Sequence, residues 1–183
     1  MSRRSRGAMR KLNMDLVLEM NRQCRLIYAC TGVALKRAYH WEKQGIVRLM
    51  GMTAQVWDEC GEISTKSMIQ MLDEETGVEV QRGDGRSWRE LAFLNAGMSI
   101  GRLTEGQLMY MRVQQKKWMA PQVTACILLA LHRKCGFDAD QIAETYSRIL
   151  EVEQECGFDE ARAQELCREE TSVNITDHVA GGW

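Results

Sequence analysis

Two stretches of this chain align without a gap at a constant offset of 96 residues: ACTGVALKRAYHWEKQGIVRLMGMTAQVWDECG at residues 29–61 and ACILLALHRKCGFDADQIAETYSRILEVEQECG at residues 125–157. Ten of the 33 aligned positions are identical, where average residue usage would give about two. After the deletion of one residue, the alignment continues with Glu74–Val78 opposite Glu169–Val173. The sequence therefore predicts an internal duplication.

Each repeat unit is predicted to form three helices followed by a short extended segment, because apolar residues recur at helical spacing through both units. In the first unit, Asn13 is expected to cap a helix whose apolar residues include Val17. Two further helices are expected at Glu42–Cys60 and Thr65–Thr76. The alternation of Val78–Val80 is typical of a strand.

The second unit carries clearer helix signals. Pro121 suits the first turn of a helix, Asp138 and Gln141 match a capping box, and Asp159 is a suitable N-cap. Val173–Ile175 is the second extended segment. The three helices of this unit are expected at Gln122–Cys135, Ala139–Cys156 and Glu160–Glu170.

We predict an all-α fold of two pseudo-repeated three-helix units that share one core. The two extended segments are also candidates to pair as a minor β-ribbon. The expected parts are a basic flexible arm (residues 1–12), a first repeat unit (13–81), a linker with two helices (82–120), a second repeat unit (121–176) and a loose tail (177–183).

Composition excludes several classes of protein. The longest strongly apolar run, Ala125–Leu131, is too short to cross a bilayer. The basic N-terminus lacks the apolar segment of a signal peptide, so we expect a cytoplasmic protein. Seven cysteines without a Cys-x-x-Cys pair favour reduced, buried thiols. His132 and Cys135 lie three residues apart on a predicted helix, and we interpret them as structural rather than catalytic or metal-binding residues.

The net charge of −1 is unevenly distributed. Residues 1–48 hold eleven Lys/Arg and three Asp/Glu, whereas residues 133–183 hold five and twelve. This polarity predicts either a basic face for a polyanion or an attraction between the two ends within the fold. The candidate basic binding residues are Arg3, Arg4, Arg6, Arg10, Lys11, Arg82, Arg86, Lys116 and Lys117. The candidate acidic binding residues are Asp138, Asp140, Glu144, Glu169 and Glu170.

No residue pattern predicts catalysis. The turn Arg82–Arg86 contains Gly-x-Gly but lacks the rest of a phosphate-binding loop. The carboxylates show no calcium-loop or di-iron spacing. The Glu-Cys-Gly sequence that begins at Glu59 recurs at Glu155 and is read as a repeated packing and capping position. We therefore expect no catalytic residue, no metal and no cofactor.

The segment Ala130–Phe137 and the Asp-capped helix after it resemble segments of small helical proteins carried by phages of Firmicutes. This likeness covers about a quarter of the chain, and Cys135 departs from the aromatic residue expected there. In length, basic N-terminus and Met and Cys content, the whole chain also resembles phage anti-CRISPR proteins directed at type II-A Cas9. These proteins share no common motif, so no binding residue transfers.

The resemblance implies a non-enzymatic protein that binds the Cas9–guide RNA complex and blocks recognition or cleavage of DNA. Its acidic surface would occupy a DNA channel of the nuclease, or its basic arm would hold guide RNA or DNA. A phage DNA- or RNA-binding regulator is the alternative, and a metal-dependent nuclease is the third hypothesis. A homodimer is also considered, because repeated helical units can leave apolar residues for a second copy to cover.

Overall fold

The computed structural model describes residues 3–60, 68–81 and 117–178, together with residues 104, 106, 109, 110 and 113; for residues 3–13 and 16 it describes the backbone alone. The described part is all-α and contains no strand. Its helices are α1 (Arg3–Tyr39), α2 (Lys43–Cys60), α3 (Met68–Thr76), α6 (Met119–Cys135), α7 (Ala139–Glu155) and α8 (Glu160–Thr171), followed by the 3₁₀ helix η2 (Ile175–Asp177).

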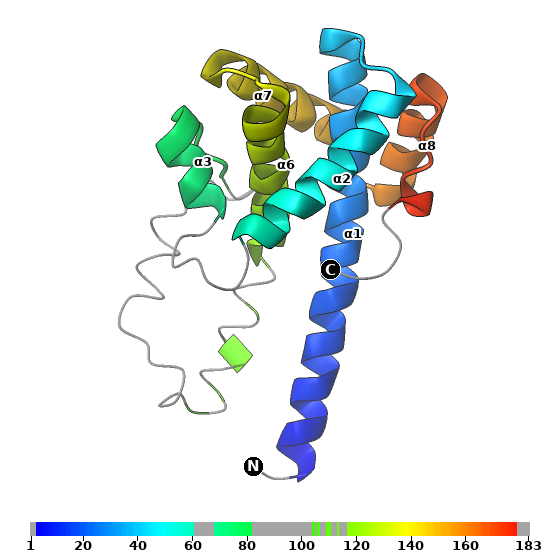
Figure 1. The fold of residues 1–183 in the computed structure, drawn as a ribbon. Coiled ribbons are helices and arrows are strands. Elements are labelled where there is room, and N and C mark those ends of the chain that lie inside the picture. The colour runs from blue at the N-terminus through cyan, green and yellow to red at the C-terminus, as the bar shows by residue number, and fades with distance from the viewer. Residues whose placement is uncertain are drawn as a thin grey trace.

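The second half of α1 forms the centre of the molecule (Figure 1). Every residue from Leu26 to Leu35 is buried, and a helix that is apolar on all sides must be covered on all sides. Helices α6, α7 and α8 provide most of this cover. The middle of α6 is similar, since every residue from Val123 to Leu131 is buried.

The two predicted repeats interlock. Helix α1 packs mainly against α7 and α8, which are the second and third helices of the other repeat. Helix α6 packs mainly against α2 and α3, and α1 and α6 also contact each other. Each repeat therefore uses the other repeat to cover its first helix.

Aligned positions at the ends of the first helices have the same backbone geometry. His40 and Gly136 both have positive φ angles, of 57° and 75°. The next residue in each case donates its N–H to a carbonyl six residues earlier, from Trp41 to Leu35 (3.3 Å) and from Phe137 to Leu131 (3.2 Å). The rings of Trp41 and Phe137 meet edge to face, with centroids 6.0 Å apart.

The ends of the third helices also correspond. The Thr76 hydroxyl donates to the Leu72 carbonyl and accepts from the Val78 N–H, and Thr171 makes the same two bonds with Cys167 and Val173. The internal duplication itself stays a prediction, because its test is the superposition of residues 29–80 on residues 125–175.

The predicted caps of the second repeat are confirmed. The Asp138 side chain accepts from the Gln141 N–H (2.8 Å), and the Gln141 side chain accepts from the Asp138 N–H (3.1 Å). Asp159 accepts from the Arg162 N–H (2.8 Å). Pro121 lies in the first turn of α6, where its missing N–H costs little.

The start of α1 differs from the prediction. Residues 3–12, expected as a flexible arm, belong to the helix, and Asn13 lies inside the helix instead of capping it. The physical reason is that this segment has no Pro and is rich in Arg, Lys, Ala, Met and Leu, which are good helix formers.

The β-ribbon prediction is wrong for the described residues. The Val78 and Val173 N–H groups bond to threonine hydroxyls, and the Gln81 N–H bonds to the Tyr146 hydroxyl. Ile175 begins η2 instead of a strand. Side-chain hydroxyls thus accept from these three N–H groups in place of a strand partner.

Other boundaries shift or lie outside the described residues. Helix α6 begins at Met119, three residues before the expected start. The third helix is described from Met68 onward, and its predicted start at Thr65 lies outside the described residues. Most of the predicted linker and the end of the predicted tail lie outside the description, at residues 82–103 and 179–183.

Candidate interaction surface

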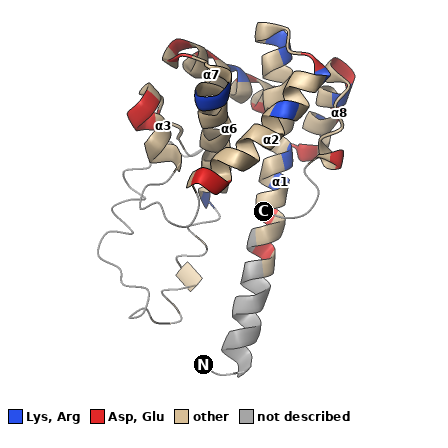
Figure 2. Ribbon diagram, in the orientation of Figure 1, with Lys and Arg blue, Asp and Glu red and all other residues tan. Residues whose placement is uncertain are grey.

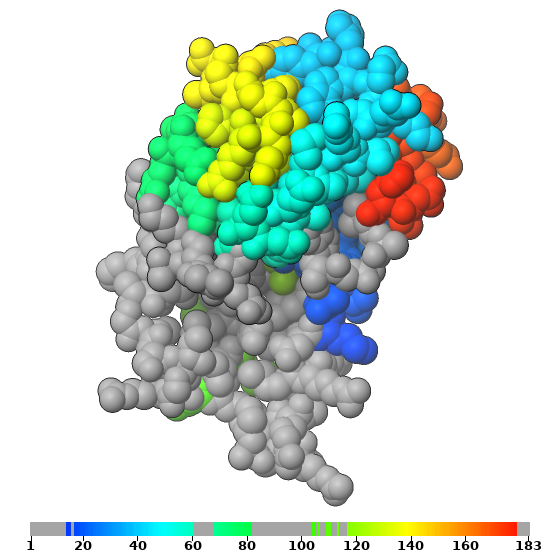
Figure 3. Space-filling view, viewed as in Figure 1, coloured from blue at the N-terminus to red at the C-terminus, as the bar shows by residue number. Residues whose placement is uncertain are grey.

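The first half of α1 extends beyond the packed helices (Figure 1). From Arg3 to Met20 the helix is about 27 Å long at a rise of about 1.5 Å per residue. The side chains of Met14, Val17 and Leu18 are 62%, 55% and 62% exposed. In the space-filling view, the described atoms of this part of α1 lie at the surface in dark blue (Figure 3). We call these three side chains the apolar collar.

Five of the predicted basic residues lie in the first three turns of this projecting helix. No acidic residue occurs between Arg3 and Lys11. We call this segment the basic tip, and its charged residues are Arg3, Arg4, Arg6, Arg10 and Lys11.

The basic residues farther along α1 are neutralised within the fold. Arg22 donates to Glu19 at 2.9 Å, and this hydrogen bond raises the pKa of its guanidinium. Arg25 forms an ion pair with Glu160, at the start of α8. Arg37 donates to Glu155 (2.7 Å) and Glu170 (2.6 Å). The expected attraction between the charged ends is therefore observed for this part of α1.

Of the remaining predicted basic residues, Lys117 alone lies within the described residues. Arg82, Arg86 and Lys116 lie outside the described residues, and Lys117 is exposed just before α6. Trp118 beside it is buried in the core.

The predicted acidic residues form two separate groups. Figure 2 shows the start of α7 and the length of α8 on opposite sides of α1 and α2. Asp138 caps α7, Asp140 is exposed, and Glu144 accepts a hydrogen bond from the Tyr39 hydroxyl (3.0 Å). Glu169 is exposed, whereas Glu170 binds Arg37. Three of the five, Asp138, Glu144 and Glu170, thus have structural partners that fix their side chains.

The repeated glutamates, Glu59 and Glu155, form ion pairs between the repeats. Glu155 binds Arg37, which lowers the pKa of the Glu155 carboxyl. Glu59 binds Lys134 at 2.6 Å. Arg133, aligned with Arg37, binds Glu75 and lies 3.5 Å from the Cys60 sulfur. These residues join the ends of packed helices.

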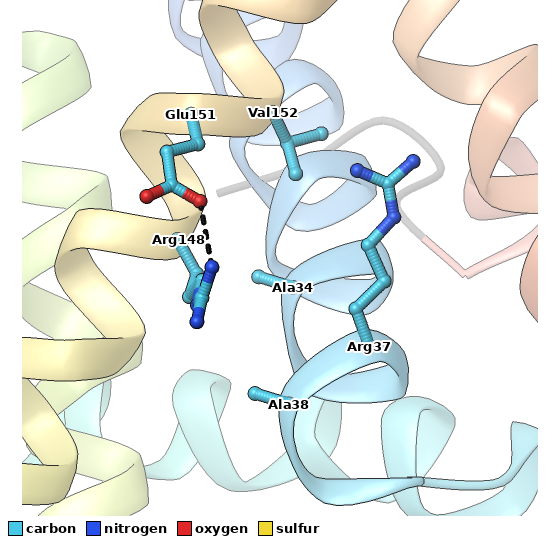
Figure 4. A pocket seen from close by; sticks show the side chains of 6 residues that line it. All are labelled: Ala34, Arg37, Ala38, Arg148, Glu151 and Val152. Carbon is cyan, nitrogen blue, oxygen red and sulfur yellow. Dashed lines mark hydrogen bonds and ion pairs between the residues drawn. The ribbon is translucent and has the colours of Figure 1, made fainter.

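A small pocket of about 200 Å³ lies between α1 and α7 (Figure 4). Arg37 and Arg148 line it on either side of Ala34 and Ala38, together with Val152 and Glu151. The Arg148 guanidinium is 3.0 Å from Glu151, and Arg37 is held by its two glutamates. Figure 4 shows the Arg37 guanidinium turned away from Arg148. The two cations therefore do not converge on a common ligand position.

No group in the described residues combines a nucleophile with a base. His132 Nδ1 lies 2.7 Å from the Phe137 carbonyl oxygen, so this ring nitrogen is already used in a hydrogen bond with the backbone. The Cys135 sulfur lies 3.8 Å from the Met52 sulfur, and burial raises the pKa of its thiol. Burial also raises the pKa of Cys24 to about 12. No cluster of three metal-ligating side chains occurs in this part of the chain.

The apolar collar was missed by the sequence reasoning. Val17 was assigned to the apolar face of the first helix, yet it is exposed. The signal available was the spacing of Met14, Val17 and Leu18, which form a stripe at i, i+3 and i+4.

Comparison with known proteins gives no relative. No protein-family model, curated protein or solved structure matches this chain. Within the described residues, no helix has both the length and the apolar character needed to span a bilayer. Function must therefore be argued from the chain's own residues.

Proposed function

We propose that this protein is a non-enzymatic binding protein that engages the phosphate backbone of a nucleic acid through the basic tip of α1. The observation that carries the proposal is the presence of five basic residues and no acidic residue, between Arg3 and Lys11, on a helix that projects from the body.

The chemistry of the basic tip suits phosphate. Each cation that neutralises a phosphate releases condensed counterions from the nucleic acid, which gives affinity without reading sequence. The free N–H groups at the helix N-terminus add a partial positive charge at the same end. A helix about 10–12 Å across also fits the DNA major groove.

The phosphate can belong to bare DNA or RNA, or to guide RNA within a nuclease complex. We favour the second source, an inhibitor of a Cas9–guide RNA complex in the cytoplasm of a phage host. The support is that the molecule presents both charge signs: a basic tip for nucleic acid and exposed acidic residues for the positively charged channel of the nuclease. A DNA- or RNA-binding regulator is the alternative.

The first experiment measures binding to bare duplex DNA and single-stranded RNA by fluorescence anisotropy between 50 and 200 mM salt. A variant with all five tip residues changed to Gln is expected to reduce the slope of log affinity against log salt by about 4. The control variant changes five exposed basic residues of the body to Gln and is expected to bind like the unchanged protein. Those control positions are Lys43, Arg48, Arg148, Arg162 and Arg168.

The second experiment titrates the protein into a Cas9 cleavage assay. Inhibition that depends on the basic tip, with weak binding to bare nucleic acid, supports the nuclease inhibitor. Tight, salt-sensitive binding to bare nucleic acid without inhibition supports the regulator. Equal behaviour of the tip variant and the body variant in both assays would overturn the proposed function.

A further inference from the structure

The pocket between α1 and α7 has two chemically different walls (Figure 4). The methyl groups of Ala34 and Ala38 lie on the α1 side, and the Arg148 guanidinium lies across from them on α7. Val152 and Glu151 complete the lining from α7. The volume of about 200 Å³ equals that of about seven water molecules at about 30 Å³ each. This space suits one flat ring system.

The small side chain of Ala38 keeps the pocket open. At the aligned position of the other predicted repeat the residue is Lys134, whose ammonium group reaches Glu59 at 2.6 Å. A methyl group thus stands in α1 where a long side chain stands in α6. Ala38 is therefore the position at which the pocket can be filled by substitution.

The charges around the pocket disfavour an anionic ligand. Two arginines line it, and each is paired with two glutamates; the pairs are Arg37 with Glu155 and Glu170, and Arg148 with Glu151 and Glu144. Two positive and four negative charges leave a balance of −2 among these residues. A phosphate or carboxylate would meet this excess of carboxylates, so the charges favour an uncharged ligand.

We propose that this pocket binds a flat, uncharged nitrogen heterocycle, of the size of a nucleobase, as a free base or nucleoside. One face of the ring stacks on the Arg148 guanidinium, because a planar cation packs well on an aromatic face. The other face lies on the methyl groups of Ala34 and Ala38. An N–H group at the edge of the ring donates to the Glu151 carboxylate, which is 61% exposed and accepts hydrogen bonds only.

The test is a titration of adenosine into the ¹⁵N-labelled full chain, followed by NMR chemical shifts. We expect saturable shifts around Ala34 and Ala38 with a Kd of about 1 mM, as is usual for a ligand that buries about ten non-hydrogen atoms. Adenosine monophosphate is expected to bind at least about threefold more weakly, because its phosphate meets the excess of carboxylates.

Two variants address the two walls separately. Ala38→Leu fills the pocket and is expected to weaken adenosine binding by at least about tenfold. Arg148→Lys keeps the charge but removes the planar face, and a similar loss is expected. Ala143→Leu adds the same atoms at an exposed position of α7 outside the pocket and is the control. Circular dichroism of all three variants should match that of the unchanged chain.

Three results would overturn the proposal. The first is the absence of saturable shifts up to about 10 mM adenosine. The second is unchanged binding in both Ala38→Leu and Arg148→Lys. The third is tighter binding of the monophosphate than of adenosine, which would assign the pocket to an anion. The variant of the basic tip is expected to bind adenosine like the unchanged chain, so this test is independent of the proposed function.

Discussion

The two predicted repeats, α1 to α3 and α6 to α8, have the same backbone geometry at the ends of their first and third helices but differ in the side chains found there. The left-handed residue after the first helix is His40 in one repeat and Gly136 in the other. The arginine of the first repeat, Arg37, binds two glutamates, whereas Arg133 binds Glu75 and contacts the Cys60 sulfur. The comparison teaches that this fold depends on where helices end and which helices they cover, more than on particular side chains.

The predicted repeats also differ in the size of the residue at one aligned core position of their first helices. A Cβ atom added to Gly32 of α1 would lie 3.1 Å from the Cys167 sulfur of α8. The aligned position in α6 is Leu128, which is fully buried. A small residue thus permits close packing in one repeat, and a large residue fills space in the other.

The largest expected effect comes from removing that large residue. Leu128→Ala should lower the free energy of unfolding by about 2–5 kcal/mol, because it leaves a cavity in the core. Gly32→Leu should also destabilise the protein, by about 1–3 kcal/mol or more, because it overpacks the contact with Cys167. Urea denaturation measures both. A Leu128→Ala variant as stable as the unchanged protein would contradict this account, because it would show that α6 does not need a large side chain at the position aligned with Gly32.

A second difference lies at the aligned positions Trp57 and Glu153. Glu153 is only 8% exposed, and burial raises the pKa of its carboxyl to about 7. The folded state therefore holds this proton more tightly than the unfolded state, whose carboxyl has the ordinary value of 4.5. The contribution of Glu153 to stability is present below pH 4.5 and is lost as the pH rises to about 7.

Glu153→Gln should remove this pH dependence. Above pH 7 the variant is expected to be more stable than the unchanged protein by up to about 3 kcal/mol, with little difference at pH 4.5. Urea denaturation across pH 4.5 to 8 checks this, with Glu151→Gln at an exposed position of the same helix as control. Equal pH profiles for Glu153→Gln and the unchanged protein would contradict the burial of a proton at Glu153.

The arginines at the repeat junctions should have smaller effects. Arg37→Gln is expected to cost about 1–2 kcal/mol and Arg133→Gln about 1 kcal/mol, because both side chains are partly exposed and Arg37 joins two carboxylates. Arg37 lowers the pKa of Glu155, so its stabilisation is present above pH 4.5 and is lost as the pH falls further. Denaturation at two salt concentrations measures these costs, and the order of the two variants tests the comparison.

The smallest expected effect on stability concerns the residue with a positive φ angle at the end of each first helix, His40 or Gly136. His40→Gly should raise the free energy of unfolding by about 0.5–1 kcal/mol, since glycine adopts positive φ without strain. Gly136→Ala should lower it by a similar amount. Thermal denaturation of the two variants should therefore show shifts in opposite directions. A loss of stability in both would indicate that the His40 side chain contributes a contact of its own.

Local signals in the sequence predicted the helices and their caps. Asp138, Gln141 and Asp159 act within one turn of chain, so their roles can be read from spacing alone. The interlocked packing could not be predicted this way, because periodicity shows which residues are buried but not which helix covers them. The same limit explains Val17, whose apolar character is clear but whose side chain has no described helix to cover it.

The candidate surface was predicted only in part. The charges of the basic tip are plain in the sequence, but their placement on a projecting helix depends on where the body of the fold ends. That end is set by contacts such as the ion pair between Arg25 and Glu160, which are 135 residues apart. The ion pair between Arg37 and Glu170 could not be predicted either, because these two residues are 133 positions apart in the sequence.

Separating the two repeats tests the interlocked fold most directly. Residues 1–81 and residues 82–183 would be produced as two polypeptides and followed by circular dichroism. We predict that neither unfolds cooperatively alone, because the first helix of each lacks the helices that cover it. Mixed together, they should form a one-to-one complex that recovers the helical signal and cooperative melting of the intact chain. Cooperative unfolding of either half by itself, with its full helical content, would contradict this account.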